Sequence, residues 1–113
     1  MQTPSLRVIA EGLRFPEGPV WLDDGSIALV EIERQTVSLV RPDGRVEVLA
    51  EVPGGPNGLA RGPDGAFYVC NCGGFGWIEE GGLLTPSGTA PGYEGGSIDR
   101  VDPHSGKVTT LYT

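Results

Sequence analysis

The chain has few of the residues that build disulfide frameworks or zinc sites. Its 113 residues include two cysteines, one histidine and one methionine. Cys70 and Cys72 lie two residues apart on an expected strand, so their side chains point to the same face and cannot easily reach disulfide geometry. A zinc site would need two further ligands, and His104 is the one histidine. We therefore expect both cysteines to be packed or free thiols.

Long apolar runs are also missing. No stretch approaches the roughly 18 apolar residues of a membrane-spanning helix. Residues 1–5 lack the charged and apolar regions of a signal peptide, so we expect a cytoplasmic protein. Apolar residues do not recur at helical spacing over any long window, which predicts almost no helix.

Positive charge is scarce. Eight lysine and arginine residues stand against 15 aspartate and glutamate residues, and the formal net charge is −7. This balance argues against nucleic acid and anionic membranes as partners. A cation or a neutral, polar small molecule is the easier ligand to accommodate.

Glycine and proline, in contrast, are abundant, with 19 and 10 residues. They occur in turns such as Asp23-Asp24-Gly25, between short apolar runs, and this pattern indicates many short strands. Four antiparallel strands in about 40 residues would form one blade of a β-propeller. The strands expected in the first half of the chain are residues 6–10, 20–22, 27–32, 36–40 and 45–50.

The sequence repeats after 40 residues. This shift places Pro16-Glu17-Gly18 on Pro56-Asn57-Gly58, and the register holds without a gap from Val8 to Glu31. A fixed period of this length predicts an all-β chain, a β-propeller fragment of two four-stranded antiparallel blades. The expected layout is an N-terminal strand in residues 6–12, blade 1 in 13–53 and blade 2 in 54–113, with an insertion at about 72–96.

The insertion is rich in glycine and carries several large apolar side chains, namely Phe75, Trp77, Leu83, Leu84 and Tyr93. A long loop of this kind is often a lid over a functional site. The alternative is a compact excursion whose aromatic residues pack on its own blade.

Two residues are candidates for a binding site. Residues just before the first strand of each blade converge at one mouth of a propeller channel, and Glu17 and Asn57 are equivalent there by the repeat. A carboxylate and an amide oxygen are the hard ligands that Ca²⁺ takes. Alternatively, Glu17 accepts hydrogen bonds from loop amides and Asn57 shapes an Asn-Gly turn.

The same residues carry a resemblance to a known family. The chain resembles the N-terminal third of the SMP-30/gluconolactonase/LRE-like family in the segments FPEGPVW, DDGS, GGPNGLARGPDGAFYV, NCGGFGW and GGSIDRVDPHSGKVTTLY. The resemblance implies a six-bladed propeller that holds one divalent cation, commonly Ca²⁺, and hydrolyses lactones. It also implies that Glu17 is a metal ligand of the first blade. Asn57 stands at the pseudo-symmetric position of the second blade, and we expect it to line the substrate site. The family's general acid/base has no counterpart here, so the catalytic residues stay unassigned.

Three functions are compatible with these features. The first is a metal-dependent, gluconolactonase-like hydrolase acting on a small-molecule lactone or ester, represented by its N-terminal blades and inactive as an isolated chain. The second is a non-catalytic propeller that binds a ligand across its channel. The third is a two-blade unit that trimerises into a six-bladed ring. Because two blades leave apolar faces open, we also expect self-association through these faces.

Overall fold

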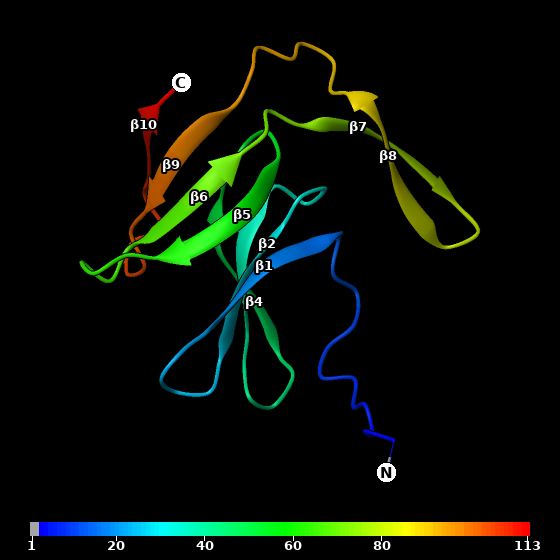
Figure 1. The fold of residues 1–113 in the computed structure, drawn as a ribbon, viewed down its shortest axis with the longest axis vertical. Coiled ribbons are helices and arrows are strands. Elements are labelled where there is room, and N and C mark those ends of the chain that lie inside the picture. Colours follow the sequence, from blue (N-terminus) through cyan, green and yellow to red (C-terminus); the bar gives the residue numbers. More distant parts are fainter. Residues whose placement is uncertain (1–2) are drawn as a thin grey trace.

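The structure is a computed structural model that describes residues 3–113. These residues form ten strands and no helix, which confirms the all-β prediction (Figure 1). The strands are β1 (Pro16–Trp21), β2 (Ile27–Glu31), β3 (Thr36–Val40), β4 (Val46–Glu51), β5 (Pro56–Arg61), β6 (Phe67–Asn71), β7 (Phe75–Glu80), β8 (Leu83–Thr89), β9 (Ser97–Val101) and β10 (Val108–Tyr112).

The first sheet is an antiparallel meander in the order β1-β2-β3-β4. Its first turn follows from local chemistry: Gly25 adopts a φ of 84°, and the Asp24 carboxylate accepts a hydrogen bond of 2.9 Å from the Ser26 N–H. A glycine takes this left-handed conformation without steric cost, and an aspartate commonly caps such turns. The apolar residues that follow form β2, which pairs with β1 and β3. Strands β2 and β3 are the two most buried strands of this sheet.

The second sheet repeats the first, in the order β5-β6-β9-β10. Strands β5 and β6 begin 40 residues after β1 and β2, as the repeat predicts. Even a register irregularity recurs, between Glu17 and Val20 in β1 and between Pro56 and Gly58 in β5. The sequence repeat therefore corresponds to two structurally equivalent four-stranded antiparallel sheets.

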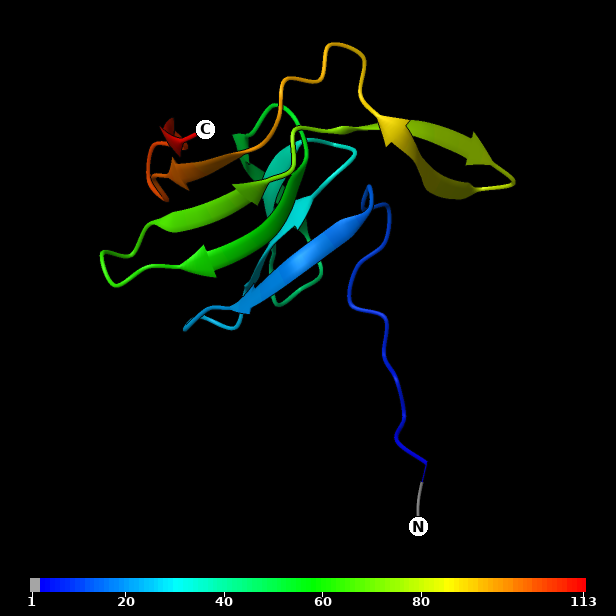
Figure 2. The ribbon, with the colours of Figure 1, turned by 45° about the horizontal axis from the view of Figure 1, so that its top comes forward.

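The two sheets pack face to face around one core (Figure 2). The first sheet and the Val52 that follows it contribute aliphatic side chains, and the second contributes Phe67, Val69 and Val101. Burying each large apolar side chain stabilises the fold by roughly 1.5–3 kcal/mol. Strand β5 of the second sheet lies against β1 and β2 of the first. The first strands of the two sheets, β1 and β5, are therefore neighbours, and we call them the inner strands.

The predicted N-terminal strand does not form. Residues 3–15 contain no strand; their first part is an N-terminal arm beside the first sheet (Figures 1 and 2), where Arg7 and Ile9 lie against the turn that joins β3 to β4. Leu6 is 97% exposed and Val8 is 73% exposed. A strand requires a hydrogen-bonded partner, and the described sheets provide none for this segment. The prediction is based on alternating apolar residues. These indicate strand propensity but do not provide the neighbouring strand with which hydrogen bonds could form.

The insertion also differs from the predicted loop. Residues 75–89 form a separate two-stranded sheet, β7-β8, which projects beside the main sheets (Figure 1). Gly81 and Gly82 close this hairpin with positive φ angles of 58° and 79°, the backbone that a type I′ turn requires. The two thiols are free, as expected, with Cys70 at the end of β6 and Cys72 just beyond it.

Candidate functional site at the start of the inner strands

Glu17 and Asn57 lie at the same end of neighbouring inner strands. Each is the second residue of its strand, and each is exposed. The backbones approach closely at this end, because a Cβ placed on Gly18 would lie 2.9 Å from the backbone nitrogen of Leu59. Gly18 also has a φ of 57°, which a glycine adopts freely. The glycine that follows Glu17 thus lets β1 approach the segment that follows Asn57.

The Glu17 carboxylate makes one hydrogen bond among the described residues, a 3.2 Å contact from the Gly18 N–H to Oε2. This hydrogen bond keeps the carboxylate close to the backbone at the start of β1. Because the side chain is exposed, its other lone pairs face solvent and are open to a ligand.

The loop before Glu17 is held by Glu31, a residue that the sequence analysis did not single out. Glu31 ends β2, is completely buried, and its Oε1 accepts a 2.7 Å hydrogen bond from the Arg14 N–H. Oε1 also accepts from the Arg34 guanidinium at 2.8 Å, and Oε2 accepts from the hydroxyls of Thr36 and Ser38. A signal was present in the sequence, because an acidic residue inside an apolar strand rarely lies buried without partners.

These contacts determine the charge of Glu31. Burial is the largest single influence and raises its pKa. The hydrogen bonds from Ser38, Arg34 and the Arg14 N–H, together with the Arg34 charge, outweigh burial, so that the pKa lies below its ordinary value. Glu31 is therefore a carboxylate at neutral pH.

Asn71 holds the second sheet in the same way. It ends β6, 40 residues after Glu31, and its Oδ1 accepts 2.9 Å hydrogen bonds from the N–H groups of Gly55 and Gly73. Its Nδ2 donates to the carbonyl of Pro53 at 2.8 Å and to Asp99 at 3.0 Å. In each sheet, the last residue of the second strand therefore fixes the loop that leads into the first.

The β7-β8 hairpin contacts the Glu17 loop. The rings of Phe15 and Trp77 lie 5.1 Å apart, and the Arg14 guanidinium bridges Glu33 at 2.8 Å and Glu79 at 3.0 Å. Hydrogen bonds from this guanidinium hold the pKa of Glu33 and of Glu79 below their ordinary values. An aromatic residue of the insertion thus contacts the loop before β1, and not its own blade alone as one interpretation expected.

The sequence matches a known family over almost the same region. A model of the SMP-30/gluconolactonase/LRE-like region matches residues 15–113, which include Glu17, both sheets and the hairpin. The chain belongs to the SMP-30/gluconolactonase/LRE-like family. A search of curated proteins found no match.

The SMP-30/gluconolactonase/LRE-like assignment raises the question of whether the donors of the chain suit a cation. Among residues 3–113, no three histidine, cysteine, aspartate or glutamate side chains gather in one place. Glu17 and Asn57 are nevertheless the right kind of donors, because Ca²⁺ takes carboxylate and amide oxygens. By its chemistry Glu17 fits as one ligand of a site that needs six to eight.

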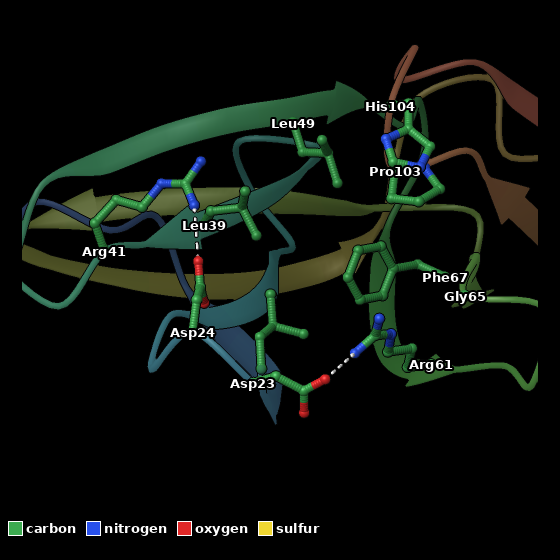
Figure 3. Close-up of a pocket in the computed structure, with 11 residues that line it drawn as sticks. Asp23, Asp24, Leu39, Arg41, Leu49, Arg61, Gly65, Phe67, Pro103 and His104 are labelled. Atoms are coloured by element: carbon green, nitrogen blue, oxygen red, sulfur yellow. Dashed lines mark hydrogen bonds and ion pairs between the residues drawn. The ribbon is translucent and has the colours of Figure 1, made fainter.

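A cavity of about 400 Å³ lies elsewhere, at the turn end of the sheets (Figure 3). Its floor is apolar, with Leu22, Leu39, Leu49 and Phe67, and its rim carries the ion pairs Arg41–Asp24 at 3.5 Å and Arg61–Asp23 at 3.9 Å. Asp23 and Asp24 follow the last residue of β1, whereas Glu17 lies at its start. The cavity is therefore separate from the Glu17 site of this SMP-30/gluconolactonase/LRE-like chain.

Within the described residues, no helix is long and apolar enough to span a membrane.

Proposed function

We propose that this chain provides the first-blade metal ligand of a metal-dependent, gluconolactonase-like hydrolase that acts on a small-molecule lactone or ester. Glu17 binds a divalent cation, of which Ca²⁺ fits its hard carboxylate best, and Asn57 contacts the substrate. The observation that carries the proposal is the close approach at Gly18, which brings the starts of β1 and β5 together. Membership of the SMP-30/gluconolactonase/LRE-like family supports it.

The chemistry follows from what these groups can do. A bound cation polarises a carbonyl and lowers the pKa of a water ligand. Glu17 contributes a negative charge that attracts the cation, and its exposed position leaves room for water and substrate. The Asn57 amide has both a donor and an acceptor, so it can orient the polar edge of a lactone. We assign no general acid or base to this chain.

A second candidate function is a binding module that holds a ligand without hydrolysing it. The 3.2 Å hydrogen bond from the Gly18 N–H to the Glu17 carboxylate favours this candidate, because it gives Glu17 a structural role. The hydrolase, in contrast, requires oxygen ligands in addition to Glu17. Further blades, or copies of this chain joined through their open sheet faces as in a three-copy ring, would place such ligands on the channel axis.

Calorimetric titration with Ca²⁺ tests the proposed role of Glu17. We expect weak binding by the chain, with a dissociation constant of about 10⁻³ M or higher, since one protein carboxylate forms an incomplete cage. Glu17→Gln removes the charge and should abolish the heat signal. The matched control is Asp23→Asn, which removes a fully exposed carboxylate (101% exposed side chain) at the other end of β1. Tight binding by a monomer, or equal binding by Glu17→Gln, would refute the assignment.

A further inference from the structure

Glu31 contacts the backbone three residues before Glu17. Its Oε1 accepts the Arg14 N–H at 2.7 Å, and the carboxylate itself is completely buried. Burying a carboxylate costs free energy unless its lone pairs accept hydrogen bonds. The Glu31 carboxylate accepts them from the Arg14 N–H, the Arg34 guanidinium and the hydroxyls of Thr36 and Ser38. The carboxylate is therefore fixed in place, and whatever it binds is fixed with it.

The backbone between Arg14 and Glu17 is held at three further points, the first of which is a 3.3 Å hydrogen bond from the Glu33 N–H to the Arg14 carbonyl. Phe15 has a φ of 62°, which costs a residue other than glycine roughly 1–2 kcal/mol, and its carbonyl accepts a 3.0 Å hydrogen bond from the Ile32 N–H. Pro16 then pairs with Glu31 across the ladder. A strained conformation persists where its surroundings hold it, and here the end of β2 does so.

The second sheet repeats this arrangement with different chemistry. Asn71 accepts the Gly55 N–H at 2.9 Å, two residues before Asn57, and is itself held by Asp99. A carboxylate in one sheet and an amide in the other occupy the same place. Each has a side-chain oxygen that accepts a hydrogen bond from a backbone N–H of the loop before the inner strand. This shared feature indicates that both residues position that loop.

We propose that Glu31 is a positioning residue for the cation site at Glu17, and that Asn71 has the same role for Asn57. Glu31 binds no cation itself. It sets the backbone at Arg14 and Phe15, and this backbone sets where β1 begins and where the Glu17 carboxylate points. The proposal rests on the proposed function of Glu17 as a cation ligand. Outer partners of this kind commonly alter metal affinity by 10–100-fold when they are removed.

The two carboxylate oxygens of Glu31 have different partners, which provides a matched control. Ser38 donates to Oε2 at 2.5 Å, whereas the Arg14 N–H bonds to Oε1. Ser38→Ala disturbs the same buried cluster without removing the bond to the loop. Glu31→Gln keeps an oxygen that can accept from the Arg14 N–H, whereas Glu31→Ala keeps none.

The experiment follows the Gly18 amide by NMR during a Ca²⁺ titration, because this amide is bonded to the Glu17 carboxylate. We expect Glu31→Ala to weaken Ca²⁺ binding by about tenfold or more, Glu31→Gln to restore most of the affinity, and Ser38→Ala to leave it within about twofold. Equal affinity in a folded Glu31→Ala, or an equal loss in Ser38→Ala, would overturn the proposal.

Amide hydrogen exchange in the unaltered chain keeps the proposal testable even if Glu31→Ala does not fold. The Arg14 amide should exchange much more slowly than an open amide of the arm, such as that of Glu11. Unprotected exchange at Arg14 would show that Glu31 does not hold the loop, and the proposal would fail. Glu17→Gln separates the two proposals: if it leaves the Ca²⁺ response at Gly18 unchanged while Arg14 stays protected, the cation assignment fails and the loop contact stands.

Discussion

Gly18 lies where β1 closely approaches β5, and its surroundings can be compared with those of Gly65. Both have positive φ angles, of 57° and 81°. A Cβ on Gly18 would meet the Leu59 backbone at 2.9 Å, whereas a Cβ on Gly65 would meet nothing within 4 Å. The pair therefore separates the cost of a left-handed backbone from the cost of a steric clash.

We expect Gly65→Ala to lower the free energy of unfolding by about 1 kcal/mol, the cost of backbone strain. Gly18→Ala should lower it by about 1–3 kcal/mol more, because the backbone of Leu59 cannot move aside as a flexible side chain would. Urea denaturation of both variants measures the difference. Equal losses would mean that the two sheets are not in contact at Gly18.

Glu31 predicts a pH dependence of stability. Its pKa is lowered in the folded chain from an ordinary value of 4.5, chiefly by hydrogen bonds that outweigh its burial. A group with a lowered pKa stabilises the fold fully above its unfolded pKa, and this contribution is lost as the pH falls through the folded value. Unfolding free energies measured from pH 7 down to pH 3 should fall less steeply in Glu31→Gln than in the unaltered chain. Parallel curves would contradict the charged state assigned to Glu31.

Only some of the candidate site residues could be predicted from the sequence. Glu17 and Asn57 could be proposed because the repeat and the family resemblance place them at equivalent positions. The role of Glu31 could not, because its importance depends on the Arg14 N–H, whose position depends on a non-glycine residue with positive φ at Phe15. A left-handed phenylalanine leaves no trace in composition or periodicity.

At the scale of elements, the β7-β8 hairpin joins the two sheets at the Glu17 end. Phe75 also contacts Trp77, with ring centroids 5.8 Å apart, so Trp77 lies between Phe75 and Phe15. The exposed pair Arg14–Glu79 adds little in water. The aromatic contact is therefore the main attachment of the hairpin to the Glu17 loop.

Trp77→Ala should release the hairpin, with a loss of about 0.5–1.5 kcal/mol beyond the area that the ring buries. We expect faster hydrogen exchange in β7 and β8 and unchanged exchange in β2 and β3. Leu83→Ala is the control, since Leu83 lies at the hairpin turn and is 73% exposed. Hairpin exchange that does not respond to Trp77→Ala would exclude this attachment.

The elements also show where pattern reading succeeds. The strands of both sheets follow from alternating apolar residues and glycine turns, and the 40-residue shift predicted the equivalent starts of β1 and β5. The first strand of blade 1 was expected at residues 20–22, with Glu17 just before it, whereas β1 spans Pro16–Trp21 and contains Glu17. Two other failures have one cause. Residues 6–10 have a strand-like sequence without a partner, and the insertion contains a hairpin because two of its own segments pair. Local pattern indicates propensity, whereas pairing decides whether a strand exists.

At the scale of the whole molecule, large apolar side chains remain exposed on both sheets. Trp21 on β1 is 72% exposed and Tyr112 on β10 is 70% exposed. Burying such side chains contributes roughly 1.5–3 kcal/mol each, which favours contact with another chain. We propose that copies of the chain associate through these faces.

Light scattering over a range of concentrations tests this association. The apparent mass should rise with concentration, and Trp21→Ser should reduce the rise. Leu83→Ser is the control, because Leu83 is equally exposed but lies on the hairpin, outside the two sheets. A constant monomer mass at high concentration would contradict the proposal.

The central claim is that the start of β1 binds a divalent cation, and Mn²⁺ tests it most directly. Mn²⁺ shares the preference for carboxylate and carbonyl oxygen and broadens nearby NMR signals even when binding is weak. We predict that the Gly18 and Gly58 amides broaden first, that Gly25 and Gly65 at the turn end broaden last, and that Glu17→Gln removes this order. Broadening that begins at Gly25, or an order that Glu17→Gln leaves unchanged, would contradict the account.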